Sequence, residues 1–162
     1  MGESPDIDDI SVADARAMAY RYLGQREHSC KELADKLVRR GVPEDIATIA
    51  VDELADENLV SDHRFAEAYV RSRVARLNGP LKIRAELSRK GIEASLIDMA
   101  LACHDEEWVQ LALAWGRRRA RKPFDKTERA RVYRNGGSRG FTHEQMMSAI
   151  DSLRDEIAEE AF

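Results

Sequence analysis

Apolar residues recur along the chain with the period of an α-helix. From residue 15 they occupy positions i, i+3, i+4, i+7 and i+8, which are Ala15, Met18, Ala19, Tyr22 and Leu23. Ser11 and Asp14 precede this stripe as helix start signals. The pattern therefore predicts one amphipathic helix.

Two further helices are predicted before residue 60. Ser29-Cys30-Lys31-Glu32 has the form of a capping box, and Leu33 and Leu37 continue an apolar stripe until Gly41 ends it. Pro43 suits the first turn of the next helix. The apolar face of that helix consists of Ile46, Ile49, Ala50 and Leu54.

The pattern returns fifty residues later. A helix that opens at Phe65 ends at Asn78-Gly79-Pro80. The positions that share the fifty-residue offset are Leu33 and Ile83, Leu37 and Leu87, Gly41 and Gly91, Ile46 and Leu96, and Ile49 and Met99. Repeated matches at one offset indicate an internal duplication of a three-helix unit. Two similar but unrelated amphipathic hairpins are the alternative.

A third, degraded copy follows. Its first apolar face consists of Trp108, Leu111, Ala112 and Trp115, and its last consists of Met146, Ile150 and Leu153. The two tryptophans are expected in the core. Gly136-Gly137 falls where Leu37 and Leu87 stand in the other copies, and two adjacent glycines cost about 2 kcal/mol of helix propensity. We therefore expect the middle helix of this copy to be short, frayed or remodelled.

These patterns predict an all-α fold of three tandem three-helix repeats, the third degraded. One such unit cannot bury its apolar face alone, so the repeats should stack into an elongated, curved array. The expected divisions are an acidic N-terminal tail (1–12), three repeats (13–60, 61–102 and 103–153) and an acidic C-terminal tail (154–162).

Charge is distributed unevenly over these divisions. The chain of 162 residues is 43% hydrophobic and 35% charged, with a net charge of −4. Residues 1–60 hold 14 acidic and 7 basic side chains, residues 61–140 hold 10 and 18, and residues 141–162 hold 6 and 1. The basic middle could meet a polyanion or an acidic partner while the rest of the protein repels it.

Several classes of function find no support in the sequence. It has no Gly-rich phosphate loop and no nucleophile with a plausible base, so we expect no catalytic residue and no enzyme. Cys30 and Cys103 are expected to be reduced, packed thiols. Together with His28 and His104 they match no common zinc spacing, so no metal or other cofactor is expected. The chain contains no apolar run typical of a signal peptide or membrane span, which indicates a cytoplasmic protein.

One segment closely resembles the signature of the RecX family. The resemblance rests on DHRFAEAYVRSR at residues 62–73 and GPLKIRAELSRKGI at residues 79–92. Glu32-Leu33, Lys36-Leu37 and Arg40-Gly41-Val42 agree with the family's opening repeat. The resemblance is strong over residues 13–102 and weak over residues 108–153, where the glycine pair departs from the pattern.

The resemblance implies a negative regulator of the RecA recombinase. Tandem three-helix repeats would bind the groove of a RecA filament on single-stranded DNA, limit its growth or promote its disassembly, and so lower strand exchange and coprotease activity. We expect such a regulator to act as a monomer.

Nine basic residues are candidates for contact with the partner or with DNA. Arg64 and Arg71 point away from the apolar face of their helix, and Lys82 and Arg89 share the outer face of the next. The densest run of cations lies further along the chain and ends at Pro123. It comprises Arg117, Arg118, Arg119, Arg121 and Lys122. Such runs are more often solvated helix faces, but the resemblance favours contact.

Arg73, by contrast, falls near the centre of the apolar face, where an unpaired charge would be costly. We expect it to form a structural ion pair with Glu86. The alternative is that its head group reaches water.

A second function is also open. Helices joined by glycine turns occur in DNA-binding proteins, so a sequence-tolerant DNA-binding protein without a RecA-specific role is the main alternative. The acidic first unit and C-terminal tail argue against DNA wrapping unaided, whereas weak direct DNA contact remains compatible with RecA binding. A third possible function is that of a scaffold that joins other proteins.

Overall fold

The computed structural model describes residues 9–162, and this part of the chain consists of helices joined by turns and loops, without strands. Its helices are α1 (Val12–Leu23), α2 (Cys30–Arg39), α3 (Glu44–Asp56), α4 (Asp62–Ala75), α5 (Pro80–Arg89), α6 (Ala94–Ala102), α7 (Trp108–Arg119), α8 (Lys126–Ser138) and α9 (His143–Glu160). None of them is long and apolar enough to cross a bilayer.

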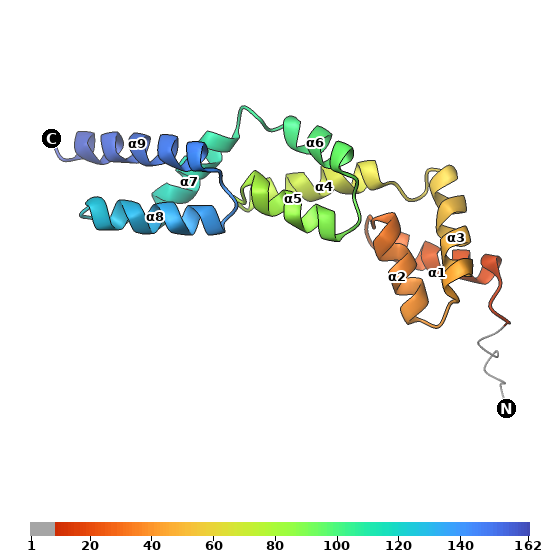
Figure 1. Ribbon diagram of the computed structural model, residues 1–162. Coiled ribbons are helices and arrows are strands. Elements are labelled where there is room, and N and C mark those ends of the chain that lie inside the picture. Colours follow the sequence, from red (N-terminus) through yellow and green to blue (C-terminus); the bar gives the residue numbers. More distant parts are fainter. Residues whose placement is uncertain (1–8) are drawn as a thin grey trace.

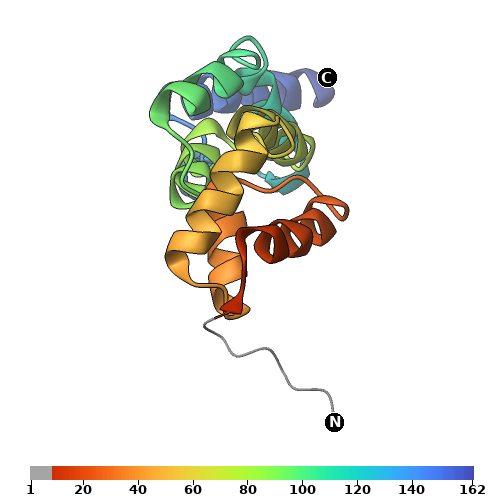
Figure 2. The same cartoon turned by 90° about the vertical axis from the view of Figure 1, so that its right-hand side faces the viewer.

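The helices form three consecutive units, which we call repeat 1 (α1–α3), repeat 2 (α4–α6) and repeat 3 (α7–α9). All closely packed helix pairs lie within one repeat, and each repeat has its own cluster of buried apolar side chains. Figure 1 shows the repeats following one another in an elongated, curved array. In Figure 2 the array is viewed with repeat 1 nearest the reader. The structure confirms the predicted all-α fold of tandem three-helix repeats.

The helix ends follow from local sequence. Ser11, Ser29 and Thr142 begin α1, α2 and α9 with complete capping boxes. After each middle helix comes a glycine with positive φ, Gly41 (94°), Gly91 (79°) or Gly140 (101°). The N–H of the next, buried residue then bonds back to the helix, for example Val42 N to Leu37 O at 3.1 Å. These Schellman turns redirect the chain into the third helix of each repeat.

The three middle helices lie end to end along the array (Figure 1). The start of α5 meets the turn after α8, where Gly79 N donates to Arg139 O at 3.0 Å and Leu81 N donates to Gly140 O at 2.9 Å. The start of α2 meets the turn after α5, where Ser29 Oγ donates to Lys90 O at 2.8 Å. We call these contacts the 2–3 joint and the 1–2 joint. At both joints a helix N-terminus meets a helix C-terminus, so the helix dipoles are aligned favourably.

Helix α8 differs from the sequence-based expectation. It is continuous from Lys126 to Ser138 and includes Gly136 and Gly137, so the prediction of a short or frayed helix is wrong. A Cβ on buried Gly136 would lie 2.3 Å from Met146 Sδ of α9. The glycine therefore permits close packing of α8 on α9, which compensates for its low helix propensity.

The C-terminal segment also differs. Helix α9 continues to Glu160, so residues 154–160 are its last two turns and not a separate tail. At the other end, α1 already begins at Val12. Residues 1–8 of the expected N-terminal tail lie outside the described residues.

Some predicted core positions are exposed. Ile49 and Met99 are 46% and 56% exposed. The buried faces of α3 and α6 are rotated relative to the prediction, since Ala47 and Val51 of α3 and Ile97 of α6 are buried in addition to predicted positions such as Ala50 and Leu54. Cys103 is also exposed rather than packed. Trp108 and Trp115 are buried, as predicted.

Candidate partner-binding surface

The basic run lies at one edge of repeat 3. Arg117, Arg118 and Arg119 form the last turn of α7, where cations also complement the helix dipole. Arg121 and Lys122 follow in the turn that leads to α8. All five side chains are exposed.

Two members of the run contact the end of α9. The Arg117 guanidinium donates to both carboxylate oxygens of Glu156, from Nε at 2.9 Å and from Nη2 at 2.5 Å. This contact lowers the pKa of Glu156 and raises the pKa of Arg117. Lys122 Nζ lies 3.0 Å from Glu160 Oε2. These two cations are partly neutralised within the protein.

The other three, Arg118, Arg119 and Arg121, form no ion pair with any residue from 9 to 162. Exposed arginines without internal partners are well suited to bind a carboxylate or a phosphate, because the planar guanidinium can donate two parallel hydrogen bonds to either anion. These three residues form the open part of the basic edge.

The backbone of this edge is held by an ion pair on α8, which we call the fork and which consists of Glu128 and Arg131. Glu128 accepts from Arg121 N at 2.8 Å and pairs with Arg131, whose Nη2 donates to Arg119 O at 2.6 Å. Its hydrogen bonds, above all those with Arg131, lower the pKa of Glu128 to about 2. Sequence reasoning missed this fork, although Glu128 follows Asp125 at the spacing of a helix start signal. The open arginines are thus presented from a fixed backbone.

The structure places the predicted contact residues of repeat 2 in different settings. Arg64 is half-buried in the 1–2 joint, where Nε lies 3.0 Å from Glu27 Oε1 and Nη1 donates to Asn58 O at 3.0 Å. Arg71 is exposed and forms no ion pair with the described residues. Because its guanidinium is already engaged, Arg64 is a weaker candidate for partner contact than Arg71.

Lys82 and Arg89 lie at the two ends of α5. Lys82 is half-buried beside the 2–3 joint, since a Cβ on Gly140 would lie 2.4 Å from Lys82 Cβ. Arg89 is exposed and lines a groove of about 330 Å³ beside the 1–2 joint, together with Tyr69 and Glu86. The nine predicted residues are therefore spread over α4, α5 and the edge of repeat 3.

Arg73 and Glu86 are brought together between α4 and α5. Arg73 Nε lies 3.0 Å from Glu86 Oε2, an ion pair whose N–H is not aligned as a hydrogen bond. Tyr69 completes the cluster. Its hydroxyl donates to Glu86 and accepts from Arg73 Nη2 at 2.9 Å. Burial, together with Glu86, raises the pKa of Tyr69. The cluster ties the first two helices of repeat 2 to each other.

The 1–2 joint is predominantly polar. Glu32 of α2 lies 2.9 Å from Lys90 Nζ and 3.2 Å from Arg26 Nη1. Burial alone would raise the pKa of Glu32, but hydrogen bonds from Lys90, Arg26 and the Ser29 N–H outweigh it and lower the pKa to about 2. Asp62 accepts from Cys30 N at 2.8 Å and so caps α2 from the next repeat.

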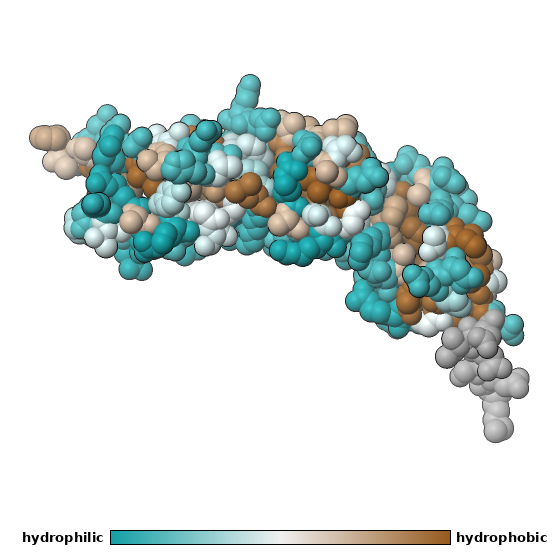
Figure 3. Space-filling view, in the orientation of Figure 1, coloured by the Kyte–Doolittle hydropathy of each residue, from teal (hydrophilic) through white to brown (hydrophobic). Residues whose placement is uncertain are grey.

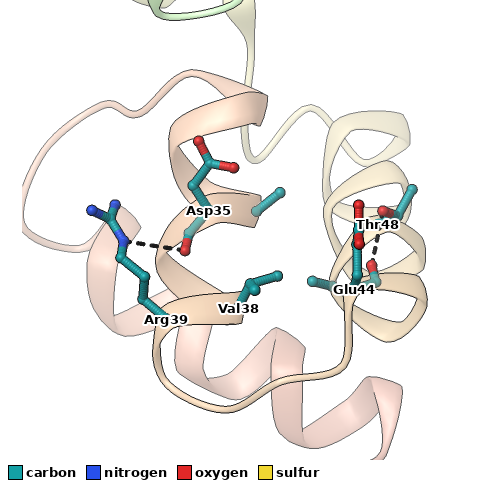
Figure 4. A pocket seen from close by; sticks show the side chains of 7 residues that line it. Asp35, Val38, Arg39, Glu44 and Thr48 are labelled. Carbon is teal, nitrogen blue, oxygen red and sulfur yellow. Dashed lines mark hydrogen bonds between the residues drawn. The ribbon is translucent and has the colours of Figure 1, made fainter.

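A separate shallow groove of about 500 Å³ lies between α2 and α3 (Figure 4). Two of its polar side chains bond to the backbone of their own helices: Thr48 Oγ1 donates to Glu44 O at 2.9 Å and Arg39 Nε donates to Asp35 O at 3.3 Å. Val38 and alanines supply its apolar lining. The groove lies in the acidic repeat 1, apart from the basic edge of repeat 3.

The histidines and cysteines are dispersed. Buried His28 contacts Arg26 O and Lys36 Nζ, both at 2.9 Å, and burial lowers its pKa. Burial also raises the pKa of the Cys30 thiol to about 11. Within residues 9–162, no three His, Cys, Asp or Glu side chains form a group that could hold a metal ion.

The face of the molecule seen in Figure 3 is mostly hydrophilic. In Figure 3, polar side chains cover much of the visible face, and apolar ones show in smaller areas between them. Such a surface suits contacts made through charge more than through a large apolar patch.

Comparison with known proteins gives consistent matches. Family models described as the first and second three-helix domains of RecX match residues 15–54 and 61–101. "Regulatory protein RecX" of Chromohalobacter salexigens is 43% identical over 140 residues, which cover 85% of this chain and 91% of that protein. The protein of the same name from Halorhodospira halophila is 40% identical over 136 residues, covering 83% and 84% of the two chains.

Two solved structures have the same architecture. RecX from Lactobacillus salivarius superposes with a TM-score of 0.80 at 26% identity, covering 88% of this chain and 96% of that one. A second structure, described as regulatory protein RecX, gives a TM-score of 0.76 at 28% identity and covers 93% and 80% of the two chains.

Proposed function

The chain belongs to the RecX family of regulatory proteins, and from this membership we propose that it binds the RecA filament on single-stranded DNA and restrains it. It would do so as a cytoplasmic monomer without catalysis of its own, limiting filament assembly and thereby strand exchange and coprotease activity. The curved array of three repeats supports this proposal, because an elongated protein can follow a long, grooved partner over several subunits.

The observation that carries the proposal is the open part of the basic edge. Arg118, Arg119 and Arg121 are exposed, lack ion pairs within residues 9–162 and extend from a backbone fixed by Glu128 and Arg131. In a protein of net charge −4, such a group is a local exception that favours an anionic partner. We propose that Arg71, Lys82 and Arg89 extend this contact along repeat 2.

The alternative is a sequence-tolerant DNA-binding protein without a RecA-specific role. The same arginines support it, because a guanidinium recognises phosphate as well as carboxylate. The acidic side chains of repeat 1 argue against it, since they would repel a DNA backbone that passed along the whole array.

One experiment separates the two functions. Binding would be compared among RecA filaments on single-stranded DNA, free RecA and bare single-stranded DNA at physiological salt, while the DNA-dependent ATPase of RecA is followed. We expect preferential binding to the filament and a lowered ATPase. Equal binding to bare DNA without any effect on the ATPase would reject the RecA-specific role.

A further inference from the structure

The acidic end of α9 lies over part of the basic edge. Helices α7 and α9 pack against each other so closely that a Cβ on Gly116 would lie 2.6 Å from Leu153 Cδ1. One turn after Leu153, Glu156 meets Arg117, the neighbour of Gly116. One turn later still, Glu160 meets Lys122. The acidic side chains are thus positioned by the packing of the core of repeat 3.

The spacing of these carboxylates matches the surface that they cover. Glu156 and Glu160 are four residues apart, which places them on the same side of a helix. Their partners Arg117 and Lys122 lie on that side. The other acidic residues of this helix end, Asp155 and Glu159, are exposed and form no ion pair with the basic run, and Asp155 pairs with Arg154 instead. The covering therefore involves one face of α9.

Both ion pairs are open to solvent. The side chains of Arg117 and Glu156 are 52% and 37% exposed, and those of Lys122 and Glu160 are 66% and 67% exposed. Exposed pairs of this kind are weak and are screened by salt. A row of phosphates could therefore displace the carboxylates without unfolding repeat 3.

We propose that Glu156 and Glu160 are an internal competitor that shields Arg117 and Lys122 from the phosphate backbone of single-stranded DNA. Arg118, Arg119 and Arg121 remain open and make the first contact. Engagement of Arg117 and Lys122 then requires the two carboxylates to move aside. This inference rests on the proposed role of the basic edge and adds a control of its affinity for DNA.

The test uses the full chain and a fluorescein-labelled oligothymidylate. E156Q/E160Q removes the two shielding charges. D155N/E159Q removes the same number of charges from the same end of α9 but leaves both pairs intact. We expect E156Q/E160Q to bind about three- to tenfold more tightly than the wild type, and D155N/E159Q to change affinity by less than about twofold. The difference between the variants should shrink as salt is raised.

Two outcomes overturn the shielding. One is an equal change of affinity in E156Q/E160Q and D155N/E159Q, and the other is no gain in affinity for E156Q/E160Q. Inhibition of the RecA ATPase, measured in parallel, keeps this test separate from the proposed function. Normal inhibition by the wild type with equal affinities of the two variants rejects the shielding alone. If only E156Q/E160Q gains affinity for the oligothymidylate, and the wild type does not inhibit the RecA ATPase, the shielding is supported and the RecA-specific role is rejected.

Discussion

Gly79 and Gly140 are in backbone contact at the 2–3 joint, where a Cβ on Gly79 would lie 2.2 Å from the carbonyl carbon of Gly140. Gly79 caps α5 and Gly140 forms the turn after α8, so two residues that are far apart in sequence bring two repeats together. Gly79 has an ordinary φ of −87°. It is therefore required by the closeness of this contact and not by its own conformation.

Substitution Gly79→Ala should consequently destabilise the joint. The added methyl group meets backbone atoms that cannot rotate away, and we expect a loss of about 1–3 kcal/mol in the free energy of unfolding, measured by urea titration with circular dichroism. Gly137→Ala is the matched control. Open space surrounds its Cβ position within α8, so this variant should gain about 1 kcal/mol. A Gly79→Ala protein as stable as the wild type would contradict this account of the joint.

The cluster of Arg73, Glu86 and Tyr69 gives a second expectation. Side chains of Arg73 and Glu86 are 30% and 17% exposed, so loss of one partner leaves a poorly solvated charge. We expect E86L to lower the free energy of unfolding by about 1–2 kcal/mol. R73M/E86L should recover most of this loss in the same urea titration, because it removes the orphaned charge as well. A double variant no more stable than E86L would show that the charge is not the cause.

Features that depend on neighbouring residues could be predicted from the sequence. The capping box at Ser29 and the turns at Gly41 and Gly91 involve only a few consecutive positions. Together with the apolar periodicity they specify the helices of each repeat. The offset of fifty residues between the first two repeats adds their tandem arrangement.

Features that depend on distant segments could not be predicted in this way. The low helix propensity of Gly136 predicts a helix break, because the sequence does not show that α9 packs against this position. The sequence predicts that Arg64 is a free surface cation, because its ion-pair partner Glu27 is 37 residues away. The acidic composition of segment 154–160 predicts a tail, whereas the segment continues α9 and its Glu156 pairs with Arg117 of the basic run. In each case the sequence alone does not show which residue from a distant segment packs against the position in question.

The 1–2 joint should weaken in acid because of Glu32. Its pKa is lowered from 4.5 to about 2 in the folded protein. A carboxylate whose pKa is depressed by folding contributes stability above its unfolded pKa, and that contribution is lost as the pH falls through the folded value. We therefore expect the Glu32 contribution to decline below pH 4.5 and to be largely gone near pH 2.

The measurement is the free energy of unfolding as a function of pH for the wild type and E32Q. The two curves should converge as the pH falls through this range, because E32Q lacks the titrating group. E159Q, which alters an exposed carboxylate of α9 outside the joint, should keep the slope of the wild type. Parallel curves for the wild type and E32Q between pH 5 and pH 2 would show that Glu32 does not supply this pH dependence.

The proposed contact surface is tested most directly by charge reversal of its open part. We expect R118E/R119E/R121E to lose inhibition of the RecA ATPase while remaining folded, since these side chains form no ion pair with residues 9–162. The control R21E/R39E/R40E reverses three exposed arginines of repeat 1 and should retain most of the inhibition. If both variants inhibit equally, the basic edge of repeat 3 is not the contact surface.

The salt dependence of binding by the same variants identifies the group that the three arginines contact. If each contacts a phosphate of single-stranded DNA, their loss should reduce the slope of log affinity against log salt by about 2, since each such contact contributes about 0.7. Carboxylates on the RecA protein release no condensed counterions, so contacts with them would lower the affinity with a much smaller change of slope. A filament affinity and slope identical to those of the wild type would exclude both kinds of contact.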